Sequence, residues 1–355
     1  MKILVIIPSY PKFSGVDFHR LWIPHTLIGK MGIEVSVINE IDSQSDEFIK
    51  AFDFIIANRF ISKTSDTTNL IKRLKELNVK YILDLDDDYQ LPVWHLLYGA
   101  AREKGHKKQI SESIQGAYAV TTTHDLLAKT IMAELGQPNV YICPNQILPE
   151  GQFQFKPVSL DKITFGWSGS ITHFEDVLMV HDSLLNLYKN DNRFRMVYGG
   201  YDGTDHTSSA IAGILSCKGT APKDQFEIFP AKDVLEYGNF YDFIDIALIP
   251  LRNNRFNNMK SNLKLLEAGF KKKAVIVSDV FPYSPMLKHG VNCLVVKNKN
   301  DWFKHMNYLI NNPKAISRLA NQLYKDVQIY HAEEVARLRY SVYVALFEKL
   351  QNQLK

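Results

Sequence analysis

The sequence predicts an α/β protein with two doubly wound parallel-sheet domains in tandem. Short apolar runs rich in β-branched residues alternate with longer segments of helical period, which is the pattern of successive βαβ units. The length of 355 residues is about twice that of an ordinary domain. A segment at 144–157 contains three prolines and one glycine, has no helical period and separates two such series. We therefore expect an N-terminal domain at 1–150 and a second domain at 151–330.

Each series contains strand-like runs separated by helix candidates. The runs of the first series are at 3–7, 34–37, 54–56, 81–83, 119–121 and 140–142, and those of the second are at 163–167, 196–198, 227–229, 246–249, 274–278 and 293–296. The helix candidates include 68–77, 126–135 and 177–188. An apolar stripe through Val335, Leu338, Val342, Leu346 and Leu350 predicts a C-terminal helix at 331–355 that packs on one of the two domains. Which domain it covers is left open.

Composition narrows the class of protein. Hydrophobic residues make up 46% and charged residues 23% of the chain, which excludes a disordered, collagen-like or coiled-coil protein. The net charge of +4 does not by itself indicate nucleic-acid binding. The longest aliphatic run, 3–7, is too short for a membrane span or a signal peptide, so we expect a cytoplasmic protein. Cys143, Cys217 and Cys293 lack the spacing of a zinc site and are predicted to be buried thiols.

The strongest motif, at 252–273, follows one predicted strand and precedes another. It contains seven basic residues and one acid. Ser261 is predicted to be the N-cap of a short helix, so that the amides of Asn262 and Leu263 are free to bind a ligand. A helix N-terminus beside Lys260 attracts negative charge, because the amides and the helix dipole both favour it. A diphosphate fits these requirements.

The spacing of Lys260, Lys264 and Glu267 places them along one face of that helix. A carboxylate one to two turns beyond a phosphate site is well placed to accept hydrogen bonds from the two hydroxyls of a ribose. The alternative is a solvated helix with a Lys264–Glu267 ion pair, since such pairs are common and weak.

A second motif, FGWSGSITHFED at 165–176, consists of a strand, a loop of small residues and a helix that opens near Thr172. The loop residues are Ser168, Gly169 and Ser170. Glycine here permits close approach of the backbone to a ligand. The alternative is a tight turn with no other role.

The segment KSNLKLLEAGFKKKAVIVSDVFPYSPMLKHGVNCLVV, at 260–296, resembles the donor-binding segment of retaining GT-B glycosyltransferases of family 4, also called glycosyl transferases group 1. The resemblance runs through a helix ending in LLEAG, a strand, a Ser-Asp pair and GVNCLVV, which is similar to the usual G-x-N-G-L-L-V. It implies the GT-B fold, in which two Rossmann-like doubly wound domains face each other across a cleft. The N-terminal domain of such enzymes holds the acceptor, and the C-terminal domain holds the nucleotide-sugar donor.

The resemblance also implies roles for donor-binding residues. Glu267 matches the glutamate that binds the nucleotide ribose, and the amides of Ser261, Asn262 and Leu263 match those that bind the diphosphate. The loop of Ser168, Gly169 and Ser170 resembles the one that touches the donor phosphates. The N-terminal loop PSYPKFSGVDFHR resembles the opening loop that faces the cleft, and its glycine, Gly15, is a further donor-binding candidate.

Three residues are candidates for catalysis. Lys260 and Arg252 are expected to stabilise the charge that develops on the departing diphosphate. Enzymes of the family commonly have a histidine near the donor sugar, and His95 or His124 is a candidate for that place. The family usually has a second glutamate eight residues before the first, where this chain has Met259. Retention or inversion of the sugar's configuration therefore stays open.

The segment DLDDD, at Asp84–Asp88, follows a predicted strand. Carboxylates clustered at a strand end suggest a divalent metal. The alternatives are the DxD metal site of GT-A glycosyltransferases, the nucleophile loop of haloacid-dehalogenase phosphatases, and a solvated acidic loop. A similar segment occurs in a subset of family 4-like enzymes, which favours a cleft-facing loop of the acceptor domain. We expect no cofactor and no requirement for a metal.

Together these features predict a glycosyltransferase that moves a hexose-type sugar from a UDP or GDP donor to an acceptor. The alternatives are a nucleotide-sugar epimerase or phosphorylase on the same fold, and a non-catalytic nucleotide-sugar-binding protein. The acceptor can be a glycan, a lipid-linked molecule, a protein or a nucleic acid. Peripheral contact with a membrane and the oligomeric state also stay open.

Overall fold

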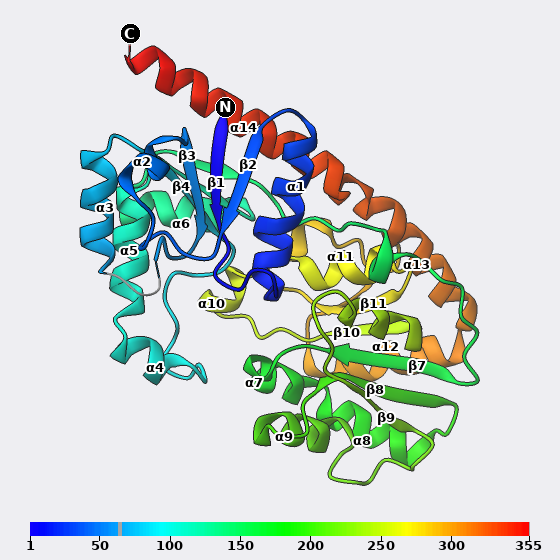
Figure 1. Ribbon diagram of the computed structural model, residues 1–355. Coiled ribbons are helices and arrows are strands. Elements are labelled where there is room, and N and C mark those ends of the chain that lie inside the picture. The colour runs from blue at the N-terminus through cyan, green and yellow to red at the C-terminus, as the bar shows by residue number, and fades with distance from the viewer. Residues whose placement is uncertain (63–65, 355) are drawn as a thin grey trace. The chain divides into compact units, whose positions relative to one another are not determined.

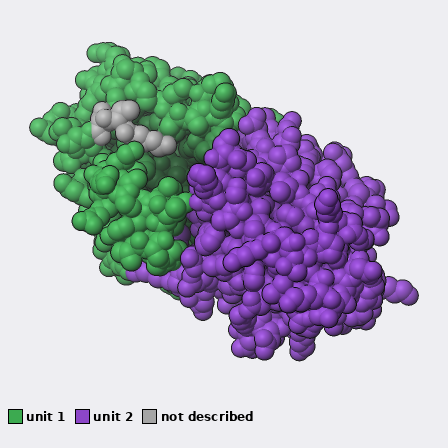
Figure 2. Space-filling model, turned by 90° about the horizontal axis from the view of Figure 1, so that it is seen from below, with its two compact units in different colours: residues 1–146, 259–261, 330–355 green, residues 147–258, 262–329 purple. Residues whose placement is uncertain are grey.

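The computed structural model describes residues 1–62 and 66–354 and contains two compact units (Figures 1 and 2). Unit 1 consists of residues 1–146, 259–261 and 330–355, and unit 2 consists of residues 147–258 and 262–329. Each unit has its own parallel sheet and its own hydrophobic core.

Unit 1 has a six-stranded sheet in the order β2-β1-β3-β4-β5-β6. Every neighbouring pair of strands is parallel, and Leu4 lies opposite Ser36 on one side and Ile55 on the other. The strands are β1 (Lys2–Ile6), β2 (Glu34–Ile38), β3 (Phe54–Asn58), β4 (Lys80–Leu85), β5 (Ala119–Thr122) and β6 (Val140–Ile142). This is the flavodoxin-like order of a doubly wound sheet, with one strand added at the edge.

Helices cover both faces of this sheet. Ile3 and Val5 of β1 face the π-helical turn η1, helix α1 and the C-terminal helix α14, whereas Leu4 and Ile6 face the opposite layer. The helical elements are η1 (Asp17–Trp22), α1 (Ile23–Lys30), α2 (Asp46–Lys50), α3 (Thr67–Glu76), α4 (Tyr98–Glu103), α5 (His106–Gly116), α6 (Asp125–Leu135) and α14 (Ala332–Leu354). The layer opposite α1 is formed by α2, α3, α5 and α6.

Helix α14 belongs to unit 1, the point that the apolar stripe alone left open. It lies against α1 (Figure 1), and Ala336, Tyr343 and Leu346 are buried in the core that α1 shares with the sheet. The Tyr343 hydroxyl lies 3.0 Å from Nε2 of His25, which is on α1.

A buried carboxylate joins four elements of unit 1. Asp84, near the end of β4, accepts hydrogen bonds from Arg20 of η1 (2.8 and 2.7 Å), Arg339 of α14 (3.1 Å) and Thr121 of β5 (2.7 Å). All four side chains are buried. Burial alone would raise the pKa of Asp84, but the two guanidinium groups outweigh it and hold that pKa well below its usual range.

Unit 2 also has a six-stranded parallel sheet, in the order β12-β11-β10-β7-β8-β9. Numbered within the unit, this is the Rossmann order 6-5-4-1-2-3. The strands are β7 (Ile163–Ser168), β8 (Phe194–Tyr201), β9 (Phe226–Pro230), β10 (Ile246–Ile249), β11 (Ala274–Ser278) and β12 (Leu294–Val296). The twelve strands of the two sheets coincide with the twelve strand-like runs of the sequence to within three residues at each end. The predicted fold class of two doubly wound sheets is confirmed.

The helices of unit 2 pack on both faces of its sheet. Trp302, Met306 and Leu309 of α12 join Leu184 of α8 and Ile211 of α9 in one core on the sheet. The α-helices are α7 (Phe174–Val177), α8 (His181–Asn190), α9 (His206–Leu215), α10 (Arg255–Asn258), α11 (Leu263–Phe270), α12 (Lys299–Asn311) and α13 (Pro313–Asp326). Short helical turns are η2 (Gly151–Phe153), η3 (Ile171–His173), η4 (Leu178–Val180), η5 (Tyr237–Phe243), η6 (Ser284–Met286) and η7 (Val327–Tyr330).

Several helix ends follow from local chemistry. The Asp66 side chain accepts a hydrogen bond from the amide of Thr68 and caps α3. Asn298 and Asp301 form a capping box at the start of α12. Helix α6 ends at Gly136, whose φ of +67° is the left-handed conformation that glycine adopts without strain.

Two expectations from the sequence concern the state of the cysteines and the presence of membrane-spanning segments. Cys143, Cys217 and Cys293 are free and buried, as predicted. Within residues 1–62 and 66–354, none of the helices combines the length and the apolar content that crossing a membrane demands.

Replacing the buried carboxylate is expected to destabilise unit 1 strongly. Asp84→Asn leaves Arg20 and Arg339 without their counter-charge, which costs about 3–5 kcal/mol of unfolding free energy. The matched control is Glu76→Gln, which removes an exposed pair with Lys72 and is expected to cost less than about 1 kcal/mol. Calorimetry or urea unfolding of the full chain measures both. Equal effects of the two substitutions would contradict the role given to Asp84.

Stability is also expected to fall as the pH drops below about 6.5. Burial lowers the pKa of His19 to about 4 and that of His25 to about 3. Below pH 6.5 the unfolded chain therefore binds protons that the folded chain does not, and each histidine removes ~1.4 kcal/mol of stability per pH unit down to its folded pKa. Urea midpoints between pH 7.5 and pH 5 measure the slope. We expect a shallower slope in His25→Gln, and an unchanged slope would refute the assignment.

Candidate functional sites

The strand order of unit 2 identifies where a ligand is expected. Strand β7 lies between β10 and β8, so the chain reverses its direction of winding between β7 and β10. In open α/β sheets, ligands bind beyond the carboxyl ends of the strands at this switch point. The segments concerned are the loop 169–170, after β7, and residues 250–262, which lead from β10 through α10 to α11.

The loop after β7 is closely packed. A Cβ atom built on Gly169 would lie 2.8 Å from Nζ of Lys264 and 2.9 Å from the ring of Trp167. Gly200, at the end of β8, has a φ of +92°, and a Cβ atom on it would lie 3.4 Å from the carbonyl oxygen of Gly169. A side chain at Gly169 would collide with Trp167, and the positive φ of Gly200 disfavours a side chain there, so neither residue is readily replaced.

Lys264 brings a positive charge to this loop. It lies in the first turn of α11, and its ammonium group donates a hydrogen bond to the carbonyl oxygen of Ser168. The same ammonium lies 5.6 Å from the ring centre of Trp167, which adds a cation–π contact. A cation therefore sits beside the small-residue loop even though the loop itself contains no basic residue.

The start of α11 differs from the prediction. The helix begins at Leu263 with Asn262 at the N-cap, and Ser261, predicted for that position, does not cap it. The Ser261 hydroxyl accepts a hydrogen bond from Asn145 (2.7 Å) instead. The reason is that residues 259–261 fold as part of unit 1, so the helix begins only after them. The amides of Asn262 and Leu263 still lie at its N-terminal end.

Glu267 lies one turn after Lys264 and is only 5% exposed. Its carboxylate oxygens accept hydrogen bonds from the hydroxyls of Tyr237 and Tyr241, the latter at 2.8 Å. Burial raises the pKa of Glu267, which the two tyrosine hydroxyls and Lys264 oppose. Every residue from Leu265 to Phe270 is buried, so α11 is not the solvated helix of the alternative interpretation. An ionised carboxylate has about four acceptor positions, and the tyrosines use two of them.

Asp176 organises the loop that follows β10. This buried carboxylate accepts hydrogen bonds from the amide of Arg252 (2.9 Å) and the side chain of Asn257 (3.1 Å) and contacts Nδ1 of His173 (2.8 Å). The guanidinium group of Arg252 pairs with Glu175 at 2.7 Å, and its side chain is 51% exposed. Arg252 is therefore attached at its backbone, with a charged group that extends into solvent.

The basic run at 252–273 does not form one positive patch. Lys271 is buried against Asp242 (2.7 Å) and the carbonyl oxygen of Gln152 (2.8 Å). Lys272 lies over the rings of Phe155 and Tyr324, at 4.4 and 4.5 Å from their centres. These lysines stabilise unit 2, and the ligand-binding charge of this segment is reduced accordingly.

Lys260 belongs to a charged cluster of unit 1. Its ammonium group lies 4.0 Å from the carboxylate of Asp87, and Arg59 lies 3.2 Å from both Asp86 and Asp87. His95 is buried. Burial lowers the pKa of its imidazole, and the charge of Lys260 lowers that pKa further. Sequence positions 59, 86–87, 95 and 260 are thus brought together.

His124 fixes the position of this short segment. Its Nδ1 accepts a hydrogen bond from the amide of Leu127, so Nε2 carries the hydrogen and donates to the carbonyl oxygens of Met259 (3.2 Å) and Lys260 (3.0 Å). The side chain of Met259 is buried in the core of unit 1. Met259, which the resemblance aligns with a glutamate of family 4 enzymes, is therefore an apolar packing position in this chain, and His124 positions Lys260.

Carboxylates of the acidic segment at 84–88 form ion pairs and hydrogen bonds with other groups of the protein. Asp84 pairs with two arginines, Asp86 and Asp87 with Arg59, and Asp88 accepts from the amide of Gln90 (3.3 Å). Across the part of the chain that the structure describes, no three His, Cys, Asp or Glu residues are grouped to hold a metal ion.

Gly15 opens the helical turn that continues into η1 and is exposed. Nothing lies within 4 Å of the place a Cβ atom would take, so packing does not require glycine there.

Comparison with solved structures gives the architecture its name. The chain superposes on sucrose-phosphate synthase from Thermosynechococcus elongatus with a TM-score of 0.75, 12% identity, and coverage of 98% of this chain and 100% of that one. A glycosyltransferase from Rickettsia africae matches with a TM-score of 0.67, 12% identity and coverage of 97% and 98%. HepE from Anabaena, in complex with UDP-glucose, matches with a TM-score of 0.68, 11% identity and coverage of 97% and 99%. The chain has the GT-B fold.

No protein-family model matches the chain, and no curated protein matches it. At 11–12% identity the structural matches establish the GT-B fold alone, so the function is argued from the residues.

Several residues of these sites were not predicted as site residues. Tyr237 and Tyr241 are about thirty residues before Glu267, and only the tertiary fold shows that they contact it. Arg59 follows β3 with a φ of +58°, a signal that the sequence does not carry. Lys264 was recognised by its spacing from Glu267, but its approach to the loop after β7 depends on how α11 packs on the sheet.

Filling the space at Gly169 is expected to disturb unit 2. In Gly169→Ala the new methyl group meets Lys264 and Trp167 at less than 3 Å, and such overpacking costs about 1–3 kcal/mol. The control is Gly213→Ala in helix α9, where nothing lies within 4 Å and alanine is expected to stabilise the helix by about 0.5–1 kcal/mol. Thermal unfolding of both variants measures the difference. A Gly169→Ala protein as stable as the parent would contradict the close packing of this loop.

Proposed function

We propose that this protein is a glycosyltransferase that transfers a sugar from a nucleotide-diphosphate donor to an acceptor. The donor is proposed to bind at the carboxyl end of the unit 2 sheet, and the acceptor to bind to unit 1. Support comes from the GT-B fold, from the similarity to HepE, whose structure holds UDP-glucose, and from the resemblance of residues 260–296 to the donor-binding segment of family 4 enzymes.

One observation carries the proposal. On α11 of unit 2, a lysine at the small-residue loop after β7 is followed one turn later by a buried carboxylate. A nucleoside diphosphate offers two negatively charged phosphates and, a few ångströms away, a ribose with two vicinal hydroxyls. Lys264 and Glu267 present the complementary groups, a cation and a hydrogen-bond acceptor, in that order along one helix.

The backbone completes the proposed donor site. The amides of Asn262 and Leu263 lie at the N-terminal end of α11, where the helix dipole favours an anion. Ser168, Gly169 and Ser170 present backbone and small side chains at the end of β7. Gly169 keeps this surface free of a side chain, so that a phosphate can approach the backbone closely.

The proposed chemistry is electrostatic stabilisation of the leaving group. The bond between the anomeric carbon of the sugar and the β-phosphate oxygen breaks, and the acceptor oxygen bonds to that carbon. The proton of the acceptor hydroxyl passes to the departing diphosphate. Lys264 and the amides at the start of α11 stabilise the charge that develops on this diphosphate. Because these groups are cationic or donate hydrogen bonds, we propose that no divalent metal is required.

Further roles are proposed for residues of both units. Arg252, half exposed at the loop after β10, is a second cation for the diphosphate. Gly15, His95, Lys260 and Ser261 are the residues that unit 1 is proposed to contribute to the reaction. The resemblance to retaining enzymes favours retention of the sugar's configuration. Buried Met259 cannot replace the glutamate that usually contacts the donor sugar, so its recognition falls to other groups.

A thermal-shift panel of UDP, GDP, ADP and CDP without metal tests the donor site. One diphosphate is expected to raise the melting temperature, because a ligand at 100 times its dissociation constant adds ~2.7 kcal/mol of stability. Lys264→Met and Glu267→Gln are expected to weaken binding at least about tenfold, which is ~1.4 kcal/mol. Lys189→Met, an exposed lysine of unit 2, is the matched control and is expected to leave binding unchanged.

The identified nucleotide then selects the sugar donors for a transfer assay in the presence of EDTA. Release of the diphosphate together with a glycosylated product supports transfer, and the anomeric configuration of that product reports retention or inversion. If none of the four diphosphates stabilises the protein, or if binding needs Mg²⁺ and ignores both variants, the donor site is not where we place it.

A further inference from the structure

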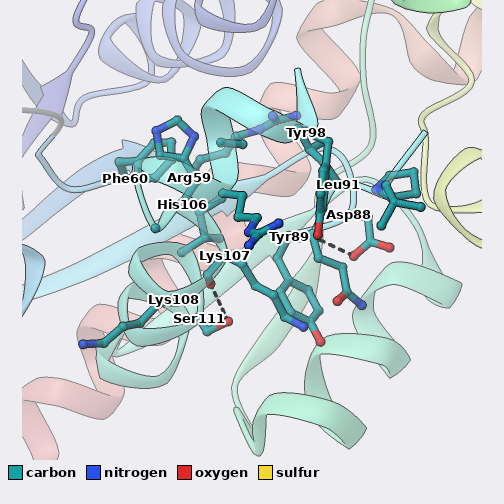
Figure 3. Close-up of a pocket in the computed structure, with 17 residues that line it drawn as sticks. Arg59, Phe60, Asp88, Tyr89, Leu91, Tyr98, His106, Lys107, Lys108 and Ser111 are labelled. Atoms are coloured by element: carbon teal, nitrogen blue, oxygen red, sulfur yellow. Dashed lines mark hydrogen bonds between the residues drawn. The ribbon is translucent and has the colours of Figure 1, made fainter. Parts of the chain in front are cut away.

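Unit 1 contains a cavity that the donor site does not account for. Its volume is about 670 Å³, within the range of pockets that hold small molecules. It lies between the segment after β4, helix α4 and the start of α5. Figure 3 shows Arg59, Phe60 and His106 along one side and Leu91, Tyr98 and Asp88 along the other. Most of the lining between these side chains is apolar, with Pro92, Val93 and Ile110 contributing to it.

One edge of the cavity continues into exposed apolar surface. Val93, which lines the cavity, is 75% exposed, and the next residues along the chain include Trp94 (48%), Leu96 (55%) and Leu97 (51%). Four large apolar side chains within five residues that remain in water are unusual for a protein surface and indicate contact with another apolar surface. We call the side chains of Val93, Trp94, Leu96 and Leu97 the apolar rim.

Basic side chains also line the cavity. Arg59 is neutralised by Asp86 and Asp87, and Lys108 lies 3.7 Å from Glu112. Arg102 and Lys107 also line the cavity and are exposed, and within residues 1–62 and 66–354 no carboxylate lies within 4 Å of either. Two unneutralised cations thus stand beside an apolar cavity that opens onto an apolar rim.

We propose that this cavity binds the acceptor, and that the acceptor is a membrane-borne amphiphile with an anionic head. The head lies at Arg102 and Lys107, the first apolar segment of the molecule lies along Leu91 and Tyr98, and the apolar rim enters the lipid surface. The inference that the bound amphiphile is the acceptor rests on the proposed function. The binding of the amphiphile itself does not depend on it.

The arrangement of charge and apolar surface favours this occupant over a soluble anion or a nucleic acid. A soluble anion needs the two cations but has no use for four exposed apolar side chains. A nucleic acid would stack its bases on aromatic rings such as those of Tyr89 and Tyr98, which line the cavity. It has no use, however, for the exposed aliphatic side chains of Val93, Leu96 and Leu97. An anionic amphiphile in a bilayer uses both features together.

The test measures binding of the full chain to phosphatidylcholine vesicles with and without phosphatidylglycerol. Binding is expected only when the anionic lipid is present, and soluble glycerol phosphate is expected not to release the bound protein. Arg102→Gln combined with Lys107→Gln is expected to weaken vesicle binding roughly thirtyfold, since each cation near an anionic surface contributes about a fivefold gain. Binding that is equal on neutral vesicles, or that the double variant leaves intact, overturns the proposal.

The matched control combines Lys30→Gln with Lys349→Gln. These exposed lysines lie on α1 and α14, which cover the face of the unit 1 sheet opposite to α5. The same charge is removed there, and binding is expected to change by less than about threefold, because distant exposed charges are screened by salt. A loss equal to that of Arg102→Gln with Lys107→Gln would reduce the effect to net charge and overturn the site.

Tryptophan fluorescence locates the contact. The chain has four tryptophans, of which Trp94 is exposed, Trp167 and Trp302 are buried and Trp22 is partly buried. A blue shift of emission on adding anionic vesicles is expected in the native protein and is expected to disappear in Trp94→Phe, which keeps an aromatic ring and still binds. A shift that survives in Trp94→Phe places the contact elsewhere and overturns the role of the apolar rim.

The two proposals fail separately. Vesicle binding is measured without a nucleotide, and the thermal-shift panel is measured without lipid. Nucleotide binding with no vesicle binding would remove the amphiphile and leave the transferase, whereas the reverse result would leave a lipid-binding protein without the proposed donor site. Binding of single-stranded RNA that depends on Arg102 and Lys107, in the absence of vesicle binding, would assign these two cations to nucleic acid and overturn the proposal.

Discussion

The buried ion cluster around Asp84 is the interaction on which the architecture of unit 1 depends. Two arginines from distant parts of the sequence, Arg20 and Arg339, converge on one carboxylate at the end of β4. Each charge is costly to bury alone, so the three groups are stable only together. The cluster holds η1 and the C-terminal helix α14 to the carboxyl end of the unit 1 sheet, next to the acidic loop at 86–88 that begins the wall of the cavity.

The carboxylates of the acidic segment at 84–88 have different partners. Asp84 forms its ion pairs in the interior, whereas Asp86 and Asp87 pair with Arg59, and Asp87 also lies near Lys260. Residues 259–261, which lead to α11, fold with unit 1, and His124 contacts the carbonyl groups of Met259 and Lys260. Lys260 is thereby part of unit 1, while Lys264, four residues later, serves the loop after β7 in unit 2. These two lysines therefore belong to different units and contact different groups.

In unit 2 the proposed donor site depends on close packing as much as on charge. Gly169 and Gly200 contribute no side chain at the ends of β7 and β8, and Trp167 and Lys264 pack against Gly169. Tyr237 and Tyr241 hold the carboxylate of Glu267 in a buried position where an isolated charge would be unstable. A carboxylate that is already fixed as a hydrogen-bond acceptor does not have to be ordered when a ligand binds. This is the physical advantage of building the site on a helix packed against the sheet.

The sequence by itself determined the twelve strands, the two doubly wound sheets and the location of the motifs at strand ends, because buried parallel strands require continuous apolar runs that are visible in one dimension. Tertiary structure alone decided that α14 covers unit 1, that α11 begins with Asn262 and not Ser261 at its N-cap position, and that Met259 is a core residue. It also decided that the basic run at 252–273 is dispersed among separate partners. These outcomes depend on which distant groups neutralise or cover a side chain, and neither periodicity nor spacing carries that information.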